Sequence, residues 1–246
     1  MPNTPYLDAS VRWKIDAGQL KLGEPRYREV VASLLESGLV TDVRRCIGSG
    51  KEADVYLALD GARPVAVKVY RTHRTSNRVS GSMKLDAIGH LVSWEYDMLV
   101  YAWRDGAPVP RPGRRIENAF SMQLLGSEER PAPRLQDVAP EVAGRVAPSV
   151  LAAVERLADA GVVHTDLSPY NILIDGSTPW IIDVGQCLRV DRLGAPPWVK
   201  VHRARQALEH GLTTLAAFFG RRGVSFDPAE RVDRIMDRID RFHRPE

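Results

Sequence analysis

The sequence contains only two cysteines, Cys46 and Cys187, and neither belongs to a CxxC motif or a Cys/His cluster. A disulfide framework and a zinc site are therefore not expected, and a reducing cytoplasm is the predicted location. No run of about 18 apolar residues occurs, which argues against a transmembrane helix. The first ten residues lack a basic stretch followed by an apolar one, so no secretory signal is predicted.

Lysine is also scarce. The chain has 34 basic residues, but the lysines are only Lys14, Lys21, Lys51, Lys68, Lys84 and Lys200. The formal net charge of +3 is too small to indicate nucleic-acid binding. Arginines gather near the C-terminus, but aspartates alternate with them, so a solvated helix face with ion pairs three or four residues apart is expected. No direct contact with nucleic acid is predicted.

The pattern of apolar residues divides the chain into two halves. In the first half, the pattern predicts a helix followed by short β-branched strands. Residues 71–89 are rich in Ser, Thr, Arg and Gly and show no apolar periodicity, so a loop is predicted there. The second half predicts long helices around one short β-hairpin. The predicted helices are 26–38, 90–103, 140–160, 200–219 and 228–242; the predicted strands are 43–47, 55–59, 65–70, 114–117, 120–125, 172–174 and 180–184.

A glycine-rich turn and a strand lysine lie in the first half. Gly48–Tyr56, read GSGKEADVY, joins two predicted strands, where glycines let backbone N–H groups approach a polyphosphate. It is not a Walker A loop, and alone a plain hairpin turn is the favoured interpretation. Lys68 lies on a strand built for burial, where lysine needs a partner. In kinases such a lysine holds the α- and β-phosphates, and Glu95 is its candidate partner.

The most specific pattern is the segment from Val163 to Ile174, read VHTDLSPYNILI. Asp166 is the candidate catalytic base, which would orient the attacking hydroxyl and accept its proton. Asn171 would bind Mg²⁺ through its amide oxygen. Asp183 comes after an apolar strand, where it would bind the magnesium that bridges the phosphates. Together with Lys68, these residues predict ATP-dependent phosphoryl transfer with Mg²⁺, or alternatively Mn²⁺.

With these motifs in place, the chain resembles the RIO family of atypical serine/threonine protein kinases, most closely its RIO1 branch, from about residue 40 to 223. The resemblance implies a bacterial or archaeal member of that branch, with bacterial favoured. Met122 is implied as the gatekeeper beside the adenine, and Asp183 itself as a candidate acceptor of the phosphoryl group. It also implies a ribosome-associated partner. The nucleotide-binding residues that it implies are Ser49, Gly50, Lys51, Glu52, Ala53, Val55, Lys68, Glu95, Met122, Gln123 and Leu125.

The resemblance implies an α+β, two-lobed protein-kinase-like fold. The expected parts are an N-terminal helical extension at 1–40, a small antiparallel N-lobe at 41–126 with the hinge at 122–126, and a mostly helical C-lobe at 127–246. The span after Asp183 is too short for an activation loop that docks peptides, so the fold is expected to be reduced. Two departures from the family pattern are Gly185, in the segment 182–186 that carries the candidate metal ligand Asp183, and Gly211, which stands where the family usually has aspartate.

Two other functions stay open at the level of sequence. Small-molecule phosphotransferases of the aminoglycoside or choline kinase kind share the HxDxxxxN loop, but the GKEA turn disfavours them. A nucleotide-binding interaction module would be expected to lose Lys68, Asp166, Asn171 or Asp183, and none is lost. The sequence therefore favours a protein kinase that phosphorylates a protein substrate or itself, with ATP hydrolysis as a further activity.

Overall fold

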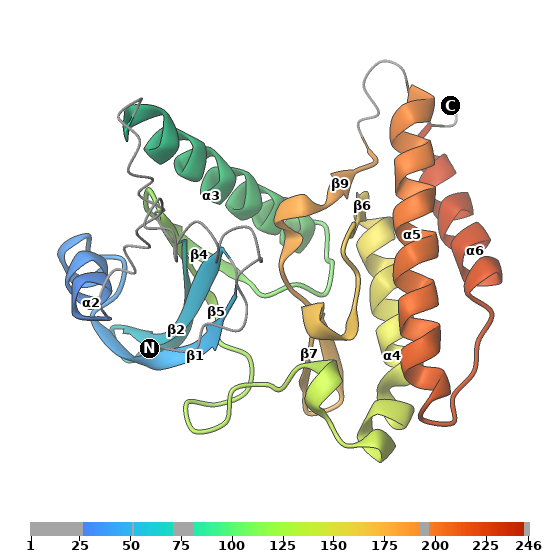
Figure 1. Cartoon of the computed structure of the whole chain (residues 1–246), viewed down its shortest axis with the longest axis horizontal. Helices are drawn as coiled ribbons and strands as arrows, with labels where there is room; N and C mark the ends of the chain where they lie inside the picture. Colours follow the sequence, from blue (N-terminus) through green and yellow to red (C-terminus); the bar gives the residue numbers. More distant parts are fainter. Residues whose placement is uncertain (1–26, 51, 71–80, 192–196, 244–246) are drawn as a thin grey trace, which may run out of the picture. The chain divides into compact units, whose positions relative to one another are not determined.

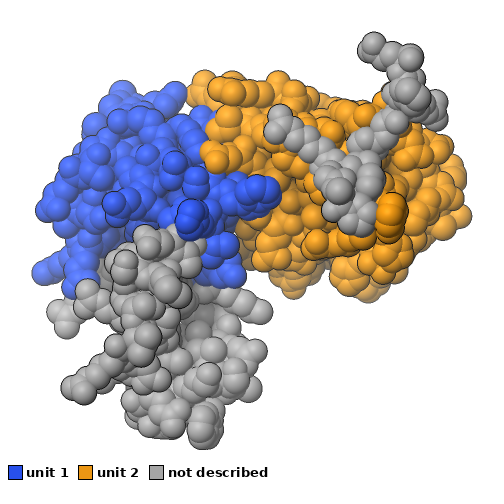
Figure 2. Space-filling view, turned by 90° about the horizontal axis from the view of Figure 1, so that it is seen from above, with its two compact units in different colours: residues 1–96, 112–124 blue, residues 97–111, 125–246 orange. Residues whose placement is uncertain are grey.

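A computed structural model of the chain describes residues 27–50, 52–70, 81–191 and 197–243. It divides into two compact units, coloured separately in Figure 2. Unit 1 consists of Met1–Tyr96 and Pro112–Leu124, and unit 2 of Asp97–Arg111 and Leu125–Glu246. The sequence-based limits at 41–126 and 127–246 stay a prediction, and most of the N-terminal extension, Lys51 and residues 71–80 lie outside the described part.

Unit 1 is a five-stranded antiparallel sheet in the order β1-β2-β3-β5-β4 (Figure 1). Val43, Tyr56 and Val67 project from its strands into a core that also takes Val30 and Leu34 from the helix α2. The β-branched residues of the central strands favour this pleated, half-buried arrangement. The bounds are α2 Tyr27–Glu36, β1 Asp42–Ser49, β2 Ala53–Asp60, β3 Arg63–Tyr70, β4 Pro112–Arg115 and β5 Ala119–Gln123.

Unit 2 is mostly helical, with α4, α5 and α6 side by side (Figure 1). Apolar residues recur along one stripe of α4, and the buried Val146, Val150, Val154 and Leu157 belong to that stripe. The helices are α4 Pro140–Asp159, α5 Pro197–Gly220 and α6 Pro228–Asp240. Short 3₁₀ turns are η1 Leu135–Asp137, η2 Pro169–Asn171, η3 Val184–Gln186 and η4 Arg241–His243, and two strand pairs are β6 Val162–Val163 with β9 Leu188–Arg189, and β7 Ile172–Asp175 with β8 Thr178–Ile181.

The predicted antiparallel sheet and mostly helical second half are confirmed, but the bounds of one helix and three strands were wrong, and one pair of strands was missed. The helix α3 runs from Gly81 to Arg104, so residues 81–89 are helical and not a loop. Leu85, Ile88 and Val92 continue the helical spacing, and this signal outweighs the serines and glycines around it. The strands expected at 114–117, 120–125 and 180–184 end earlier, at Arg115, Gln123 and Ile181. The pair of β6 and β9 was not predicted, because two-residue strands leave no periodic signal.

The C-terminal arginines bind acidic side chains, but mostly not along their own helix. Arg231 and Arg238 of α6 both bind Glu155 of α4, at 2.7 Å and 3.0 Å, and Arg238 also binds Asp159 at 2.7 Å. The expected pairing within the helix occurs at Arg234, which lies 2.8 Å from the carboxylate four residues earlier. These ion pairs connect α6 with α4, so the arginines stabilise the packing of the unit. Among the described helices, none is long and apolar enough to cross a membrane.

Candidate active site

Lys68 and Glu95 form the predicted ion pair of unit 1. The Lys68 Nζ lies 2.6 Å from Oε1 and 2.9 Å from Oε2 of Glu95, so the contact is bidentate. The side chains retain only 14% and 6% of their exposure, and the Lys68 ammonium also lies 5.3 Å from the centre of the Tyr70 ring. Lys68 belongs to β3 and Glu95 to α3. A charge pair this deeply buried fixes the position of the ammonium, as a phosphate-binding lysine requires.

The glycine-rich segment forms the connection between β1 and β2. The Gly50 N–H donates to the carbonyl of Ala53 at 2.9 Å, and the Ser49 hydroxyl donates to Asp54 Oδ1 at 2.7 Å. Val55, on β2 just after this connection, lies opposite Lys68 on β3, so the connection lies next in sequence to the strand residue that faces the ion pair. Ser49 and Glu52 are exposed, whereas Ala53 is buried. A tight hairpin closed by its own backbone is therefore present; a role in nucleotide binding stays a prediction.

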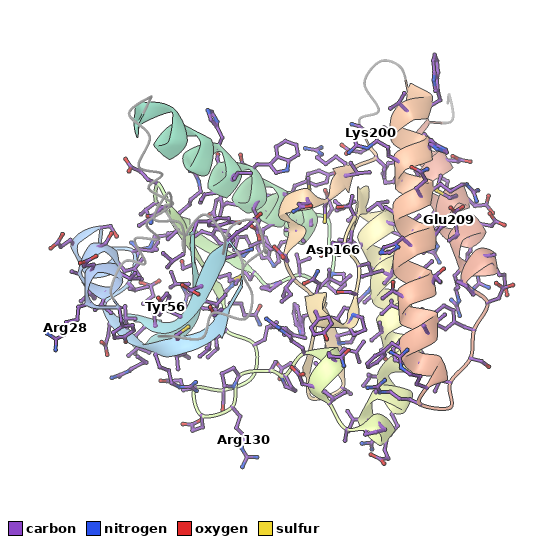
Figure 3. The ribbon with its side chains drawn as sticks, viewed as in Figure 1. Arg28, Tyr56, Arg130, Asp166, Lys200 and Glu209 are labelled. Carbon is purple, nitrogen blue, oxygen red and sulfur yellow. The ribbon has the colours of Figure 1, made fainter. Side chains whose placement is uncertain are left out.

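The catalytic-loop residues lie together in unit 2. The Asn171 Nδ2 donates to the Asp166 carbonyl at 2.8 Å and approaches the Asp166 Oδ2 at 3.3 Å. This donation fixes the orientation of the Asn171 amide; a metal-binding role for its Oδ1 stays a prediction. The Asp166 side chain is exposed, and Figure 3 shows where it lies in unit 2. The turn η2 between the two residues brings them close.

Asp183 lies at a turn just after β8. Its backbone φ is 63°, which makes it the non-glycine residue with a left-handed conformation in the described part of the chain. A non-glycine residue rarely adopts this conformation, and such residues cluster at functional sites. The strand had been predicted to continue to Val184; it ends at Ile181 because the chain turns here into η3. The turn leaves the Asp183 side chain exposed.

Hydrogen bonds connect the catalytic loop with this turn. The Ile182 N–H donates to the carbonyl of Asn171 at 3.0 Å. The His164 Nδ1 accepts the N–H of Asp166 at 3.1 Å, so its Nε2 carries the proton and donates to the carbonyl of Ile182 at 3.0 Å. The His164 ring is buried, and burial lowers its pKa below the ordinary value. A neutral histidine therefore connects Asp166 with the chain just before Asp183.

A close backbone approach supports the catalytic loop from α5. A Cβ placed on Gly211 would lie 2.7 Å from Cβ of Leu167, the residue after Asp166. The lack of a side chain at Gly211 is therefore what lets Leu167 pack against the helix. The sequence showed this glycine only as a departure from the family pattern. In the structure, Leu167 packs against α5 at Gly211. This packing, and not a carboxylate on α5, supports the catalytic loop here.

The predicted adenine-binding residues lie at the end of β5 and after it. Met122 pairs with Ala66, and Gln123 with Val65, both on β3. The carbonyl of Leu125 accepts the N–H of Ala132 at 2.9 Å. Their assignment as hinge residues stays a prediction.

Comparisons with known proteins identify the family. The family model described as the RIO domain matches residues 54–232. This chain belongs to the RIO family. It is 30% identical over 230 residues to the RIO-type serine/threonine-protein kinase Rio1 of Haloferax volcanii, which covers 86% of this chain and 76% of that protein. It is 26% identical to the Rio1 protein of Thermoplasma acidophilum, over 75% of this chain and 98% of that protein.

Human serine/threonine-protein kinase RIO1 is 29% identical over 68% of this chain, and the match spans only 33% of the human protein. The crystal structure of a Rio2 kinase–ADP/Mg²⁺–phosphoaspartate complex from Chaetomium thermophilum superposes with a TM-score of 0.64 at 22% identity, over 95% of this chain and 78% of that chain. This likeness shows the RIO kinase fold. The prediction of a RIO-type serine/threonine kinase is thus confirmed at the level of the family, whereas the bacterial origin is not tested.

Several contacts in unit 2 involve residues that no sequence motif had singled out. His164 and Thr165 lie inside the recognised loop, yet only the folded chain shows what they bind. Tyr101, at the end of α3, stacks against the Arg189 guanidinium at 3.6 Å, and Arg189 binds Asp191 just after β9. Tyr101 is far in sequence from Arg189 and Asp191, which lie two residues apart. No motif would have brought them together.

Proposed function

We propose that this RIO-family chain transfers the γ-phosphoryl group of ATP, with Mg²⁺, to a serine or threonine of a protein or of itself. The observation that carries the proposal is the set of hydrogen bonds between the catalytic loop and the turn that carries Asp183: the Asn171 side chain donates to Asp166, and the Asn171 carbonyl accepts the N–H of Ile182. The names of the relatives support the choice of acceptor, because they are serine/threonine-protein kinases.

In the proposed reaction Lys68 binds the α- and β-phosphates, and Glu95 holds its ammonium in place. Asp166 orients the acceptor hydroxyl and takes its proton as the oxygen attacks the γ-phosphorus, while ADP leaves with the electrons of the broken bond. Positioning and electrostatic stabilisation supply most of the acceleration in phosphoryl transfer. In this proposal the ion pair of Lys68 with Glu95 and the hydrogen-bonded loop around Asp166 provide the positioning and the electrostatic stabilisation.

Asn171 and Asp183 are the residues that would hold the magnesium. Both offer hard oxygen atoms, which Mg²⁺ prefers. Within the described ranges no three His, Cys, Asp or Glu side chains form a group that could hold a metal by themselves. A site with two protein ligands that phosphates and waters complete fits this arrangement, because Mg²⁺ usually keeps several waters. When bound, the ion would neutralise the negative charge that develops on the phosphates.

The segments after Asp183 indicate the kind of acceptor. Among the described residues only η3 and β9 lie between Asp183 and α5. A small polar substrate needs a concave site with several convergent polar groups, and these segments are short. A protein segment or the chain itself is therefore the proposed acceptor. Asp183 as a phosphoryl acceptor, the ribosome-associated partner and the absence of nucleic-acid contacts stay predictions of the family likeness and the charge pattern.

The test incubates the purified chain with γ-labelled ATP and Mg²⁺ and traces the label. Transfer to serine or threonine of the chain or of an added protein is expected, and a hydroxylamine-sensitive adduct would indicate an acyl phosphate on aspartate. A parallel ADP-release assay offers aminoglycosides, choline and sugars. Saturable, fast turnover with one of these alcohols would replace the protein-kinase proposal with the small-molecule alternative.

A further inference from the structure

The turn that carries Asp183 needs to be fixed on both sides to hold its carboxylate in one place. Its left-handed φ of 63° is unfavourable for a residue with a side chain. Gly185 lies two residues later, within the 3₁₀ turn η3, and glycine restricts the backbone least of all residues. A turn that combines an unfavourable residue with a permissive one relaxes easily unless other contacts restrain it.

Before Asp183 the restraint is clear. Ile182 donates to the carbonyl of Asn171 and accepts from the His164 ring, both at 3.0 Å. After Asp183, a side chain of the catalytic loop forms a hydrogen bond with the turn. The Thr165 hydroxyl donates to the carbonyl of Gln186 at 2.8 Å. The pairing of Leu188 with Val163 begins only two residues further on.

We infer that Thr165 is a positioning residue for the metal site: its hydroxyl holds the carbonyl of Gln186 and so fixes the turn that presents Asp183. Thr165 directly precedes Asp166. The same short segment therefore contains the proposed proton acceptor and the hydroxyl that holds the backbone after the proposed metal ligand Asp183. The inference rests on the proposed function, because it concerns the same magnesium site. It assigns a role to a threonine whose identity the proposed reaction does not itself require.

The hydroxyl can be separated from the shape of the side chain. Valine has nearly the same shape as threonine but cannot donate a hydrogen bond, whereas serine keeps the hydroxyl and loses the methyl group. The bond lies near the surface, so its loss should have a moderate effect, in the range that single hydrogen bonds contribute. Thr165→Val is expected to raise the magnesium concentration for half-maximal effect about 2- to 10-fold. Thr165→Ser should stay within about 2-fold of the wild type.

A matched control comes from unit 1. The Thr41 hydroxyl donates to the carbonyl of Leu59 at 3.0 Å and accepts the N–H of Gly61 at 3.0 Å. Thr41→Val therefore also removes a hydroxyl-to-carbonyl bond, far from the proposed metal ligands in sequence and in another unit. This variant should leave the magnesium dependence unchanged. A purely structural role for Thr165 would give the opposite pattern: a lower unfolding midpoint in urea and an unaltered magnesium dependence.

The experiment measures ADP binding by calorimetry over a range of Mg²⁺ concentrations and ATP hydrolysis over the same range, for wild type, Thr165→Val, Thr165→Ser and Thr41→Val. A shift confined to Thr165→Val supports the inference. Equal magnesium dependence of wild type and Thr165→Val overturns it and leaves the proposed function standing. A wild type that neither binds ADP in Mg²⁺ nor hydrolyses ATP refutes the proposed function, and the inference with it.

Discussion

Replacing Gly211 by alanine should destabilise the protein, although the same change in a helix usually stabilises. Alanine is favoured over glycine inside a helix by about 1 kcal/mol. At Gly211, however, the new Cβ would lie 2.7 Å from Cβ of Leu167, well inside the 3.4 Å at which ordinary contact begins. Overpacking of this kind costs about 1–3 kcal/mol. The net expectation is a loss of up to about 2 kcal/mol in the free energy of unfolding.

The change should also reduce activity, because the displaced residue adjoins Asp166. The clashing atom is the first carbon of the Leu167 side chain, so the loop backbone has to move by about 0.7 Å to relieve it. Leu167 directly follows Asp166, and a misplacement of about 1 Å can lower a rate by about 100-fold. We expect ATP hydrolysis by Gly211→Ala to fall about 10-fold or more, with ADP affinity nearly unchanged.

Gly144→Ala is the control within the same unit. Gly144 lies inside α4, and its nearest neighbour to a new Cβ is Val224 at 3.6 Å, an ordinary contact. Urea unfolding should therefore show this variant to be stabilised by about 0.5–1 kcal/mol. If Gly211→Ala unfolds at a higher urea concentration than the wild type and keeps full activity, the packing of Leu167 does not position the catalytic loop.

Two further predictions concern Lys68 and His164. Lys68→Ala should weaken MgADP binding as well as the rate, because Lys68 would touch the nucleotide; calorimetry that finds unchanged affinity would contradict its role. The pKa of buried His164 is lowered, so the unfolded chain binds a proton there at a higher pH than the folded chain does. The free energy of unfolding should thus be fully retained above about pH 6.5 and fall as the pH drops below that value, and His164→Gln should reduce this slope; an equal slope in the variant would exclude His164 as its cause.

The sequence predicted most of the architecture, because the strands and long helices carry clear periodic patterns. The pairing of Lys68 with Glu95 could also be predicted, since a buried lysine needs a partner. Contacts between short irregular segments could not. The bond from Thr165 to Gln186, the stacking of Tyr101 on Arg189 and the pairing of β6 with β9 arise only when distant segments meet.

The left-handed turn at Asp183 illustrates the same limit. The apolar run Ile181-Ile182 predicted a strand that continued through this residue. In the folded chain, hydrogen bonds to Ile182 from two parts of the catalytic loop hold the backbone in another conformation. Local propensity favoured the strand, and tertiary contacts outweighed it. The approach of Gly211 to Leu167 is equally invisible in sequence, where a missing aspartate was the only sign.

The most direct test of the central claim compares wild type with Asp166→Ala in a Mg²⁺-dependent phosphoryl-transfer assay, with ADP affinity measured on the same preparations. We expect a rate about 10²- to 10⁴-fold lower, because general base catalysis contributes about that much, with nucleotide affinity nearly intact. An Asp166→Ala protein that transfers the γ-phosphoryl group as fast as the wild type would contradict the assignment of this loop as the catalytic centre.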